Sequence, residues 1–528
     1  MNDPADLALA TGPASETGTP AVEGDPAPAG DPAAPAAAPA SDEGHRTQPT
    51  SAAFRAFIAG DWEPRPEVLP ELLEAAGWAR ARREALSAQF PGARLVLPAG
   101  VLRVRSNDTD YRFRAHAAFA HLSGLGAEAE PDSVLVLEPN GEGHEALLFV
   151  RPRAPRDSKE FYADARYGEL WVGARPTLEE VSARTGLAAR HLDELSELIG
   201  SGDLGDAGAL RIVPGADPAV EDQVAATRAT AGVDVEAALA ADAQLRRADS
   251  ELRLGKDAWE VGQLRLAVEA TARGFADIVR RLPEAVATPR GERVVETAFE
   301  GRARLEGNGV GYDTIAAAGT HACTLHWIRN DGPVREGDLV LVDAGVEVDS
   351  LYTADVTRTI PVSGRFSPEQ AEVYQAVLDA ADAAFAVARP GVLFREVHQA
   401  AMRVIAQRVH DWGWLPGSVE ESLDPEGQFH RRWMVHGTSH HLGIDVHDCA
   451  QARRDMYLDA PLRPGMVFTI EPGLYLQPDD LLVPPAWRGI GVRIEDDVLV
   501  TDDGVENLSA MLPRTVAGIE EWMASLRG

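Results

Sequence analysis

The sequence predicts a mixed α/β (α+β) protein in which a smaller α/β domain precedes a larger domain with an internal repeat. The chain has 528 residues and a mass of 56.5 kDa, which favours two or three domains over one. Short strand-like runs alternate with helical stretches after residue 50, and one helix–helix–strand pattern occurs twice after residue 250. With 45% hydrophobic residues, most of the chain can bury a core.

The charge balance excludes several classes of partner. Lysine and arginine number 50 against 83 carboxylates, which gives a formal net charge of -33. Without a general positive field, binding to nucleic acid or to an anionic membrane is disfavoured. No uncharged apolar run approaches the roughly 18 to 20 residues that span a bilayer, and the N-terminus lacks the features of a signal peptide. The two cysteines, Cys323 and Cys449, cannot form a disulfide framework, so we expect a cytoplasmic protein.

Residues 1–50 form an acidic leader rich in alanine and proline. The segment has hardly any large apolar side chain, so burial cannot offset the entropy lost on ordering. We expect it to be disordered, although a rigid spacer or a partner-binding tail has the same composition.

Residues 51–250 are predicted to form the smaller α/β domain. Strand-like apolar runs occur at 95–97 and 133–137, and a helical pattern covers 70–86. The segment 227–250 is rich in alanine and aspartate and is typical of a connecting helix, which could equally be the last element of this domain.

Residues 251–528 are predicted to form the larger domain, which opens with an amphipathic helix. This helix starts near Asp257, and we expect Pro283 to end it. A second helix begins with Ser367 as N-cap, followed by proline at the first helical position. Each is followed by another helical stretch, at 292–304 and at 394–412.

A template repeated after each helix pair carries most of the functional information. Residues 335–345 and 463–473 both read Arg, any residue, Gly, any residue, four mostly apolar residues, a carboxylate, any residue, Gly. The carboxylates are Asp343 and Glu471, and a pseudo-twofold arrangement would make them neighbours in space. Asp355 and Glu495 lie in segments rich in Val, Ile and Thr, which we expect to pair with the preceding strand as hairpins.

Four carboxylates gathered in a sheet core repel one another unless they are protonated or bind cations. Divalent metals resolve this, and one imidazole ligand favours Mn²⁺, Co²⁺, Fe²⁺ or Zn²⁺ over Mg²⁺. Four histidines occur within twelve positions: His436, His440, His441 and His447. Alone, such a cluster could be a surface accident or a structural zinc site. With the acids, it predicts two metals bridged by a hydroxide that attacks an acyl carbon.

Five local motifs carry a family resemblance. Asp343-Ala-Gly, Asp355-Val-Thr-Arg-Thr, His436-Gly-Thr-Ser-His440, Glu471-Pro-Gly and Arg493-Ile-Glu495-Asp occur in this order. The series resembles that of the pita-bread metallopeptidases, most closely the aminopeptidase P group. The resemblance implies a pita-bread catalytic domain with a dinuclear site, usually manganese. Its ligands would be Asp343, Asp355, His440, Glu471 and Glu495.

The resemblance also implies roles for individual residues. Glu471 would act as general base and acid, while His326 and His447 would hold the scissile carbonyl and stabilise its oxyanion. His436 resembles a histidine outside the ligand set that supports the site, and Arg493 could balance excess carboxylate charge. We expect His441 to pack outward. Three N-terminal stretches, at 106–114, 122–125 and 169–175, resemble aminopeptidase P, in which this domain packs in the oligomer and helps close the site; Arg175 is a candidate for that contact.

The predicted activity is hydrolysis of the bond between an N-terminal residue and a following proline. Proline lacks an amide hydrogen and fixes φ, so such bonds need a dedicated pocket. The alternatives are a prolidase that cleaves only Xaa-Pro dipeptides, a creatinase-like C–N hydrolase, and a binding module that has lost its chemistry. We expect peptide substrates with proline in second position and a homo-oligomer, either dimer or tetramer. Ala120 and Asp313 depart from common family residues and put pocket closure and local charge in question.

Overall fold

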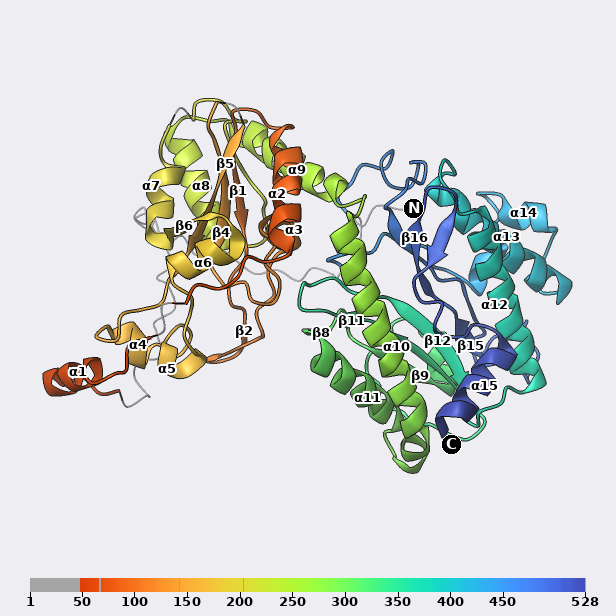
Figure 1. The fold of residues 1–528 in the computed structure, drawn as a ribbon. Helices are drawn as coiled ribbons and strands as arrows, with labels where there is room; N and C mark the ends of the chain where they lie inside the picture. The colour runs from red at the N-terminus through yellow and green to blue at the C-terminus, as the bar shows by residue number, and fades with distance from the viewer. Residues whose placement is uncertain (1–47, 66–67, 142, 203, 528) are drawn as a thin grey trace, which may run out of the picture. The chain divides into compact units, whose positions relative to one another are not determined.

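A computed structural model describes residues 48–65, 68–141, 143–202 and 204–527 (Figure 1). The leader is predicted to be disordered, and its residues 1–47 lie outside the described ranges. Within the described ranges, no helix is both long enough and apolar enough to cross a membrane.

A five-stranded mixed sheet forms the centre of the N-terminal domain. Its strand order is β6-β5-β4-β1-β7. Strand β4 pairs antiparallel with β1 and with β5, whereas the outer strands β7 and β6 pair parallel with their neighbours. The strands predicted at 95–97 and 133–137 are confirmed as β1 and β4. The bounds are β1 Arg94–Pro98, β4 Val134–Pro139, β5 His144–Val150, β6 Ala188–His191 and β7 Leu210–Ile212; a separate hairpin joins β2 Val104–Ser106 to β3 Thr109–Asp110.

Helices flank this sheet. Helix α2 begins at Ala75, five residues later than the sequence pattern predicts, because the Leu73 N–H donates to the Arg184 carbonyl and is not available to a helix. The segment 227–250, predicted as one connecting helix, contains the last residues of α8, a break at 231–234 and most of α9, which Asp234 caps. The helices are α1 Ala52–Ala59, α2 Ala75–Ser87, α3 Ala117–Ser123, α4 Lys159–Ala163, α5 Glu169–Val172, α6 Leu178–Thr185, α7 Leu195–Ile199, α8 Pro218–Thr230 and α9 Val235–Leu252, with the 3₁₀ turn η1 at Leu192–Glu194.

The larger domain contains the predicted pair of helix–helix–strand units. Helices α10 (Ala258–Ala287) and α11 (Gly291–Glu306) pack together and precede the sheet β12-β10-β9. Helices α12 (Pro368–Val387) and α13 (Phe394–Asp411) pack together and precede the sheet β13-β16-β17. The expected Ser367 cap is confirmed, since Ser367 and the third helical residue form a reciprocal capping box. Smaller helical elements are η2 Gly319–Cys323, α14 Val419–Leu423, η3 Phe429–Arg432 and the C-terminal α15 Val516–Arg527.

The prediction that Pro283 ends the first helix is wrong. Helix α10 continues through Pro283 to Ala287. Proline removes one backbone donor, but Leu282 and Ala285 on either side of it are fully buried in the core. Burial of this last turn outweighs the missing hydrogen bond.

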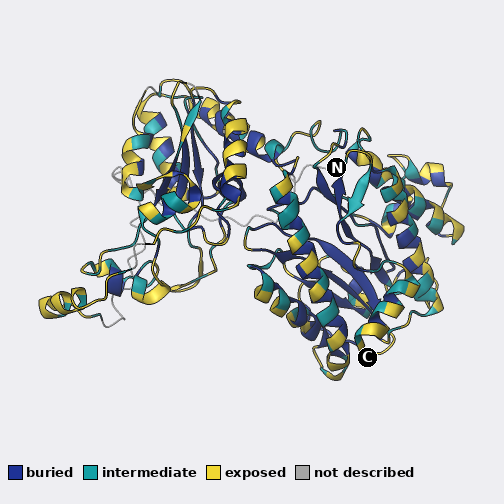
Figure 2. Ribbon diagram, viewed as in Figure 1, coloured by how far each residue is buried: buried dark blue, intermediate teal, exposed yellow. Residues whose placement is uncertain are grey.

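Both predicted hairpins form. Strand β10 pairs antiparallel with β12, with Asp343 opposite Thr357. Strand β13 pairs with β16, and β14 pairs with β15 so that Gly473 lies opposite Arg493. The strands are β8 Gly309–Val310, β9 Ile315–Ala318, β10 Leu339–Ala344, β11 Val346–Glu347, β12 Val356–Pro361, β13 Val467–Ile470, β14 Gly473–Tyr475, β15 Gly491–Arg493, β16 Asp496–Val500 and β17 Val505–Asn507. These strands are largely buried (Figure 2), so their ends lie in the protein interior.

A buried polar group lies at the start of α10. The Glu260 carboxylate is 2% exposed and accepts a hydrogen bond of 2.7 Å from the Tyr352 hydroxyl. His121 Nε2 lies 3.5 Å and Arg82 Nη2 3.7 Å from its oxygens. Burial raises the pKa of Glu260, but the hydrogen bond and charge of His121, and the charges of Arg82 and Lys256, outweigh it and hold the pKa well below its ordinary value.

Candidate metal centre

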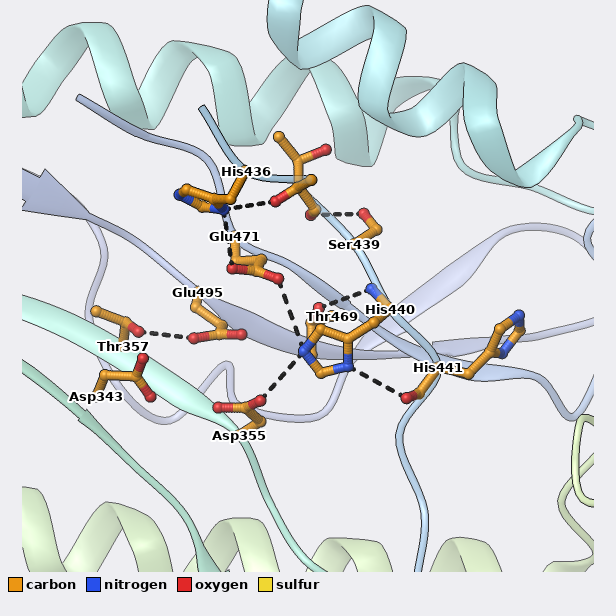
Figure 3. Close-up of polar contacts among 12 residues, drawn as sticks. Asp343, Asp355, Thr357, His436, Ser439, His440, His441, Thr469, Glu471 and Glu495 are labelled. Atoms are coloured by element: carbon orange, nitrogen blue, oxygen red, sulfur yellow. Dashed lines mark hydrogen bonds and ion pairs between the residues drawn. The ribbon is translucent and has the colours of Figure 1, made fainter. Parts of the chain in front are cut away.

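Strand ends from both halves of the larger domain bring the four predicted acids to one cavity (Figure 3). Asp343 lies near the end of β10, and Asp355 immediately precedes β12. Glu471 follows β13, and Glu495 lies between β15 and β16. Asp343 and Glu471, 128 positions apart by number, line the same cavity, as the repeated template predicts.

His440 supplies the imidazole of this cluster. Its Nε2 lies 3.3 Å from an Asp355 oxygen and 3.6 Å from a Glu471 oxygen (Figure 3). Its Nδ1 lies 3.2 Å from the His441 carbonyl, which accepts the Nδ1–H and leaves Nε2 as the free donor atom. The backbone segment is fixed against β13, because the Thr469 N–H donates to the His440 carbonyl at 2.9 Å.

Direct bonds between the halves hold the acids together. The Glu495 N–H donates to the Thr357 carbonyl at 3.1 Å, and the Thr357 hydroxyl donates to the Glu495 carboxylate at 2.6 Å. The Asp355 N–H donates to the Asp497 carboxylate at 3.1 Å. Two residues of the first hairpin are thus tied to two residues of the second.

Arg493 and Tyr312 contact the acids from the side. The Arg493 guanidinium forms a close ion pair with Asp343 and donates to the Tyr475 hydroxyl at 3.0 Å. The Tyr312 hydroxyl bonds to Asp343 at 2.7 Å and to Asp355. Arg493 therefore lies where the sequence predicted a charge-balancing residue.

Without bound cations, the buried carboxyl groups of the cluster are not all ionised. Burial, followed by repulsion from the neighbouring carboxylates, raises the pKa of Asp355, Glu471 and Glu495. Burial lowers the pKa of His440, but the hydrogen bond with Asp355 and the charge of Glu471 raise it to about 9. A compact acidic site of this kind is stabilised by cations.

The donor set fits divalent metal ions. Ligand atoms of Asp355, His440 and Glu495 all lie within 4.8 Å of one another, and carboxylate oxygens of Asp343 and Glu471 line the same cavity. Four carboxylates and one imidazole suit a hard or borderline divalent ion.

The cavity next to the acids has a volume of about 550 Å³. His326 and His447 line it together with apolar side chains of Ile315, Leu325 and Val446. The rings of His440 and His447 meet edge to face with centroids 4.5 Å apart. Burial lowers the pKa of His447. Both histidines therefore face a cavity that combines acids on one side with an apolar lining.

His436 supports the cluster through a short hydrogen-bond chain. Its Nδ1 donates to the Gly437 carbonyl at 2.6 Å, and its Nε2 accepts from the Tyr475 hydroxyl at 2.7 Å. Burial and the nearby Arg493 charge lower the pKa of His436 to about 3, so the ring is neutral. The chain from Arg493 through Tyr475 to His436 ends 3.5 Å from a Glu471 oxygen.

The expectation that His441 packs outward is wrong. His441 is 1% exposed and stacks on Phe394 with ring centroids 4.7 Å apart. Neither ring nitrogen has a hydrogen-bond partner among the described residues. Burial lowers the pKa of His441 to about 3. The alternation of side chains next to β13 places His440 in the cavity and His441 in the opposite, apolar layer (Figure 3).

Three further predicted residues, Arg175, Ala120 and Asp313, lie in different surroundings. Arg175 is buried in the N-terminal domain, where it donates to the Tyr167 and Pro152 carbonyls and pairs with Glu160. The described residues that line the metal-site cavity do not include Arg175. Ala120 is buried in α3, whereas Asp313 is exposed and lines the cavity.

Sequence reasoning missed several contacts of the site. Tyr312, Thr357, Tyr475 and Asp497 each hydrogen-bond to a predicted ligand or to Arg493. Asp497 follows Glu495 by two positions, and this spacing could have indicated that its side chain lies on the same face as that of Glu495. The tyrosines and threonine lie in patterns that read equally well as ordinary core or strand residues.

Comparison with known proteins agrees with this geometry. Residues 262–502 match the profile described as Metallopeptidase family M24, and residues 79–202 match Aminopeptidase P, N-terminal domain. Xaa-Pro aminopeptidase 1 of Streptomyces coelicolor is 52% identical over 453 residues, which cover 85% of this chain and 87% of that protein. The Xaa-Pro aminopeptidase of Escherichia coli is 33% identical over 84% of this chain and 97% of that protein. The structure of zinc-substituted E. coli aminopeptidase P in complex with product matches with a TM-score of 0.73 at 30% identity, over 87% of this chain and 100% of that one.

Proposed function

The chain belongs to metallopeptidase family M24, and we propose that it is a metal-dependent aminopeptidase that hydrolyses the bond between an N-terminal residue and a following proline. The observation that carries the proposal is the convergence of four acids and one imidazole on a cavity that also holds two uncoordinated histidines. Relatives that match across both domains are Xaa-Pro aminopeptidases, which favours this activity over a prolidase.

We propose a site for two divalent ions, filled by Mn²⁺, with Asp343, Asp355, His440, Glu471 and Glu495 as ligands. The mixed oxygen and nitrogen donor set supports this choice. Bound ions would polarise the scissile carbonyl and make a water molecule nucleophilic at neutral pH.

The chain's own residues would divide the remaining work. Glu471, whose pKa burial raises, would accept the proton of the attacking water and deliver it to the proline nitrogen as the bond breaks. His326 and His447 would donate hydrogen bonds to the carbonyl oxygen as negative charge develops there. His436, held neutral by burial and by the nearby Arg493 charge, would keep Glu471 in place, and Arg493 would offset the charge of Asp343.

The apolar part of the cavity suits a proline ring. Ile315, Leu325 and Val446 contribute apolar surface beside the two histidines. A pocket of this kind recognises proline by shape, because the imide nitrogen has no hydrogen to donate.

The deciding experiment measures turnover of three peptides: an Xaa-Pro-Xaa tripeptide, an Xaa-Pro dipeptide and a Met-Ala peptide. Each is assayed after exhaustive chelation and again after return of Mn²⁺. We expect cleavage of the tripeptide that is lost on chelation and restored by metal. Cleavage of the dipeptide alone would select a prolidase, and no cleavage by metal-loaded protein would indicate a binding module.

We further propose domain limits of 51–250 and 251–528 after a leader at 1–50. The two family matches fall within these limits, and α9 ends at Leu252. We propose for assembly a homo-oligomer in which the N-terminal domain helps close the site; Arg175, the predicted contact, is buried and paired with Glu160 inside that domain and is not exposed for it. Light scattering of the purified protein tests the dimer or tetramer.

A further inference from the structure

The loop at 443–449 carries His447 but gives its ring no direct support. Neither nitrogen of the His447 ring hydrogen-bonds to another described residue. The ring meets that of His440 edge to face. The position of His447 in the cavity is therefore set by the backbone of the loop.

The next residue, Asp448, anchors that backbone in the interior. Asp448 is 1% exposed. One carboxylate oxygen accepts from Lys256 Nζ at 3.0 Å; the other pairs with Arg253 Nη1 at 3.0 Å and accepts from the Cys449 N–H at 2.8 Å. The Asp448 N–H donates to the His441 carbonyl at 2.9 Å, which closes the loop.

The Lys256 side chain is buried and its ammonium group bonds to Asp448, so these two residues form the anchor of the loop. The side chain of Lys256 has 0% exposure, and Nζ also donates to the Arg253 carbonyl at 2.6 Å. Burial lowers the pKa of Lys256, but the Asp448 charge more than compensates and raises it above its ordinary value. The same partners hold the pKa of Asp448 below its ordinary value despite burial. Both groups are charged at neutral pH.

The loop fits closely around this ion pair. A Cβ at Gly443 would lie 2.1 Å from an Asp448 oxygen and 3.0 Å from Lys256 Cε, so only glycine fits there. Cys449 adopts a left-handed conformation with φ of 60°, which turns the chain directly after Asp448.

The anchor belongs to the segment that links α9 to α10. Lys256 lies just before α10, and its N–H donates to the Gly465 carbonyl at 2.8 Å. Arg114 of the N-terminal domain supports the same loop by donating to the Ile444 carbonyl at 2.6 Å. The loop is thus held by residues outside the predicted ligand and pocket set.

We propose that Lys256 and Asp448 are positioning residues for catalysis, which hold His447 against the substrate carbonyl. This inference rests on the proposed function. Misplacing a group that contacts the reacting carbonyl by about 1 Å can cost about 100-fold in rate. Metal binding need not change, because neither residue contacts the predicted ligands' donor atoms.

The test is a double-mutant cycle on Xaa-Pro-Xaa hydrolysis by the full Mn²⁺-loaded protein. Lys256→Met, His447→Ala and the combined variant are compared with the wild type. We expect Lys256→Met to lower kcat about 10- to 100-fold with a smaller change in KM. In the His447→Ala background the same substitution should have little further effect. Equal losses in both backgrounds would show that Lys256 acts through general stability, and would overturn the proposal.

Two further variants keep the result interpretable. Asp448→Asn retains an oxygen that can accept from the Cys449 N–H, and it should reproduce the kcat loss if Lys256→Met does not fold. Arg228→Met breaks a similarly buried ion pair with Asp242 in the N-terminal domain and should leave kcat and bound Mn²⁺ unchanged. If Lys256→Met and Asp448→Asn both kept wild-type activity, the positioning role would be refuted while the proposed function would stand. If the wild-type protein itself were inactive, the proposed function would be refuted.

Discussion

Replacement of Arg493 by methionine should destabilise the metal-free protein much more than the metal-loaded protein. The Arg493 side chain is 4% exposed and Asp343 is 11% exposed, so their ion pair lies in the interior. Removing one partner of a buried pair typically costs about 3–5 kcal/mol, because the other charge is left uncompensated.

Metal should relieve most of this cost. If Asp343 binds a divalent ion, its charge stays balanced without Arg493. The remaining loss is then that of the hydrogen bonds to Tyr475, at 3.0 Å, and Thr357, at 3.1 Å. At about 0.5–1.5 kcal/mol for each bond, we expect a loss of about 1–3 kcal/mol with Mn²⁺ present.

Urea denaturation after exhaustive chelation, repeated with Mn²⁺, measures both values. Arg228→Met is the matched control, since Arg228 pairs with Asp242 at 2.6 Å with side-chain exposures of 9% and 6%. Its loss of unfolding free energy should be the same with and without metal. If Arg493→Met also shows equal losses, then Arg493 does not balance a metal-ligating Asp343 and the reasoning is refuted.

Three other outcomes are expected. Asp355→Ala or Glu471→Ala should abolish turnover while far-UV circular dichroism stays unchanged; full activity in either variant would show the ligand assignment to be wrong. Glu260, whose pKa is depressed, stabilises the fold above its ordinary pKa of 4.5, so the stability advantage of wild type over Glu260→Gln should shrink as the pH falls from 5 towards 3; a constant difference contradicts this. His441→Phe should raise the free energy of unfolding by about 1 kcal/mol, because it removes two unpartnered buried nitrogens; calorimetry showing a lower midpoint would argue against it.

The sequence was most informative where a local pattern repeats. The shared template around Asp343 and Glu471 predicts two strands that end in acids, and the flanking β-rich segments predict the hairpins that carry Asp355 and Glu495. Each inference needs only neighbouring residues and their periodicity. His440 was identifiable because its motif accompanies the acids.

Features that depend on distant contacts escaped prediction. Pro283 fails to end α10 because the following turn is buried in the core, and no local pattern reveals that burial. His441 appears polar in sequence, yet it lies in the apolar layer opposite His440. Tyr312 joins two acids 31 and 43 positions away, and nothing beside it in the sequence indicates the bond.

The two hairpins of the larger domain each contribute one pair of acids, and bonds such as that from the Glu495 N–H to the Thr357 carbonyl at 3.1 Å join them. One hairpin alone would present its carboxylates to open water with nothing opposite. A protein made of a single unit could assemble this chemistry only by pairing with an identical copy about a twofold axis. Because both units lie in one chain, they are free to differ, and His440 lies on one side without a matching histidine among the proposed ligands of the other.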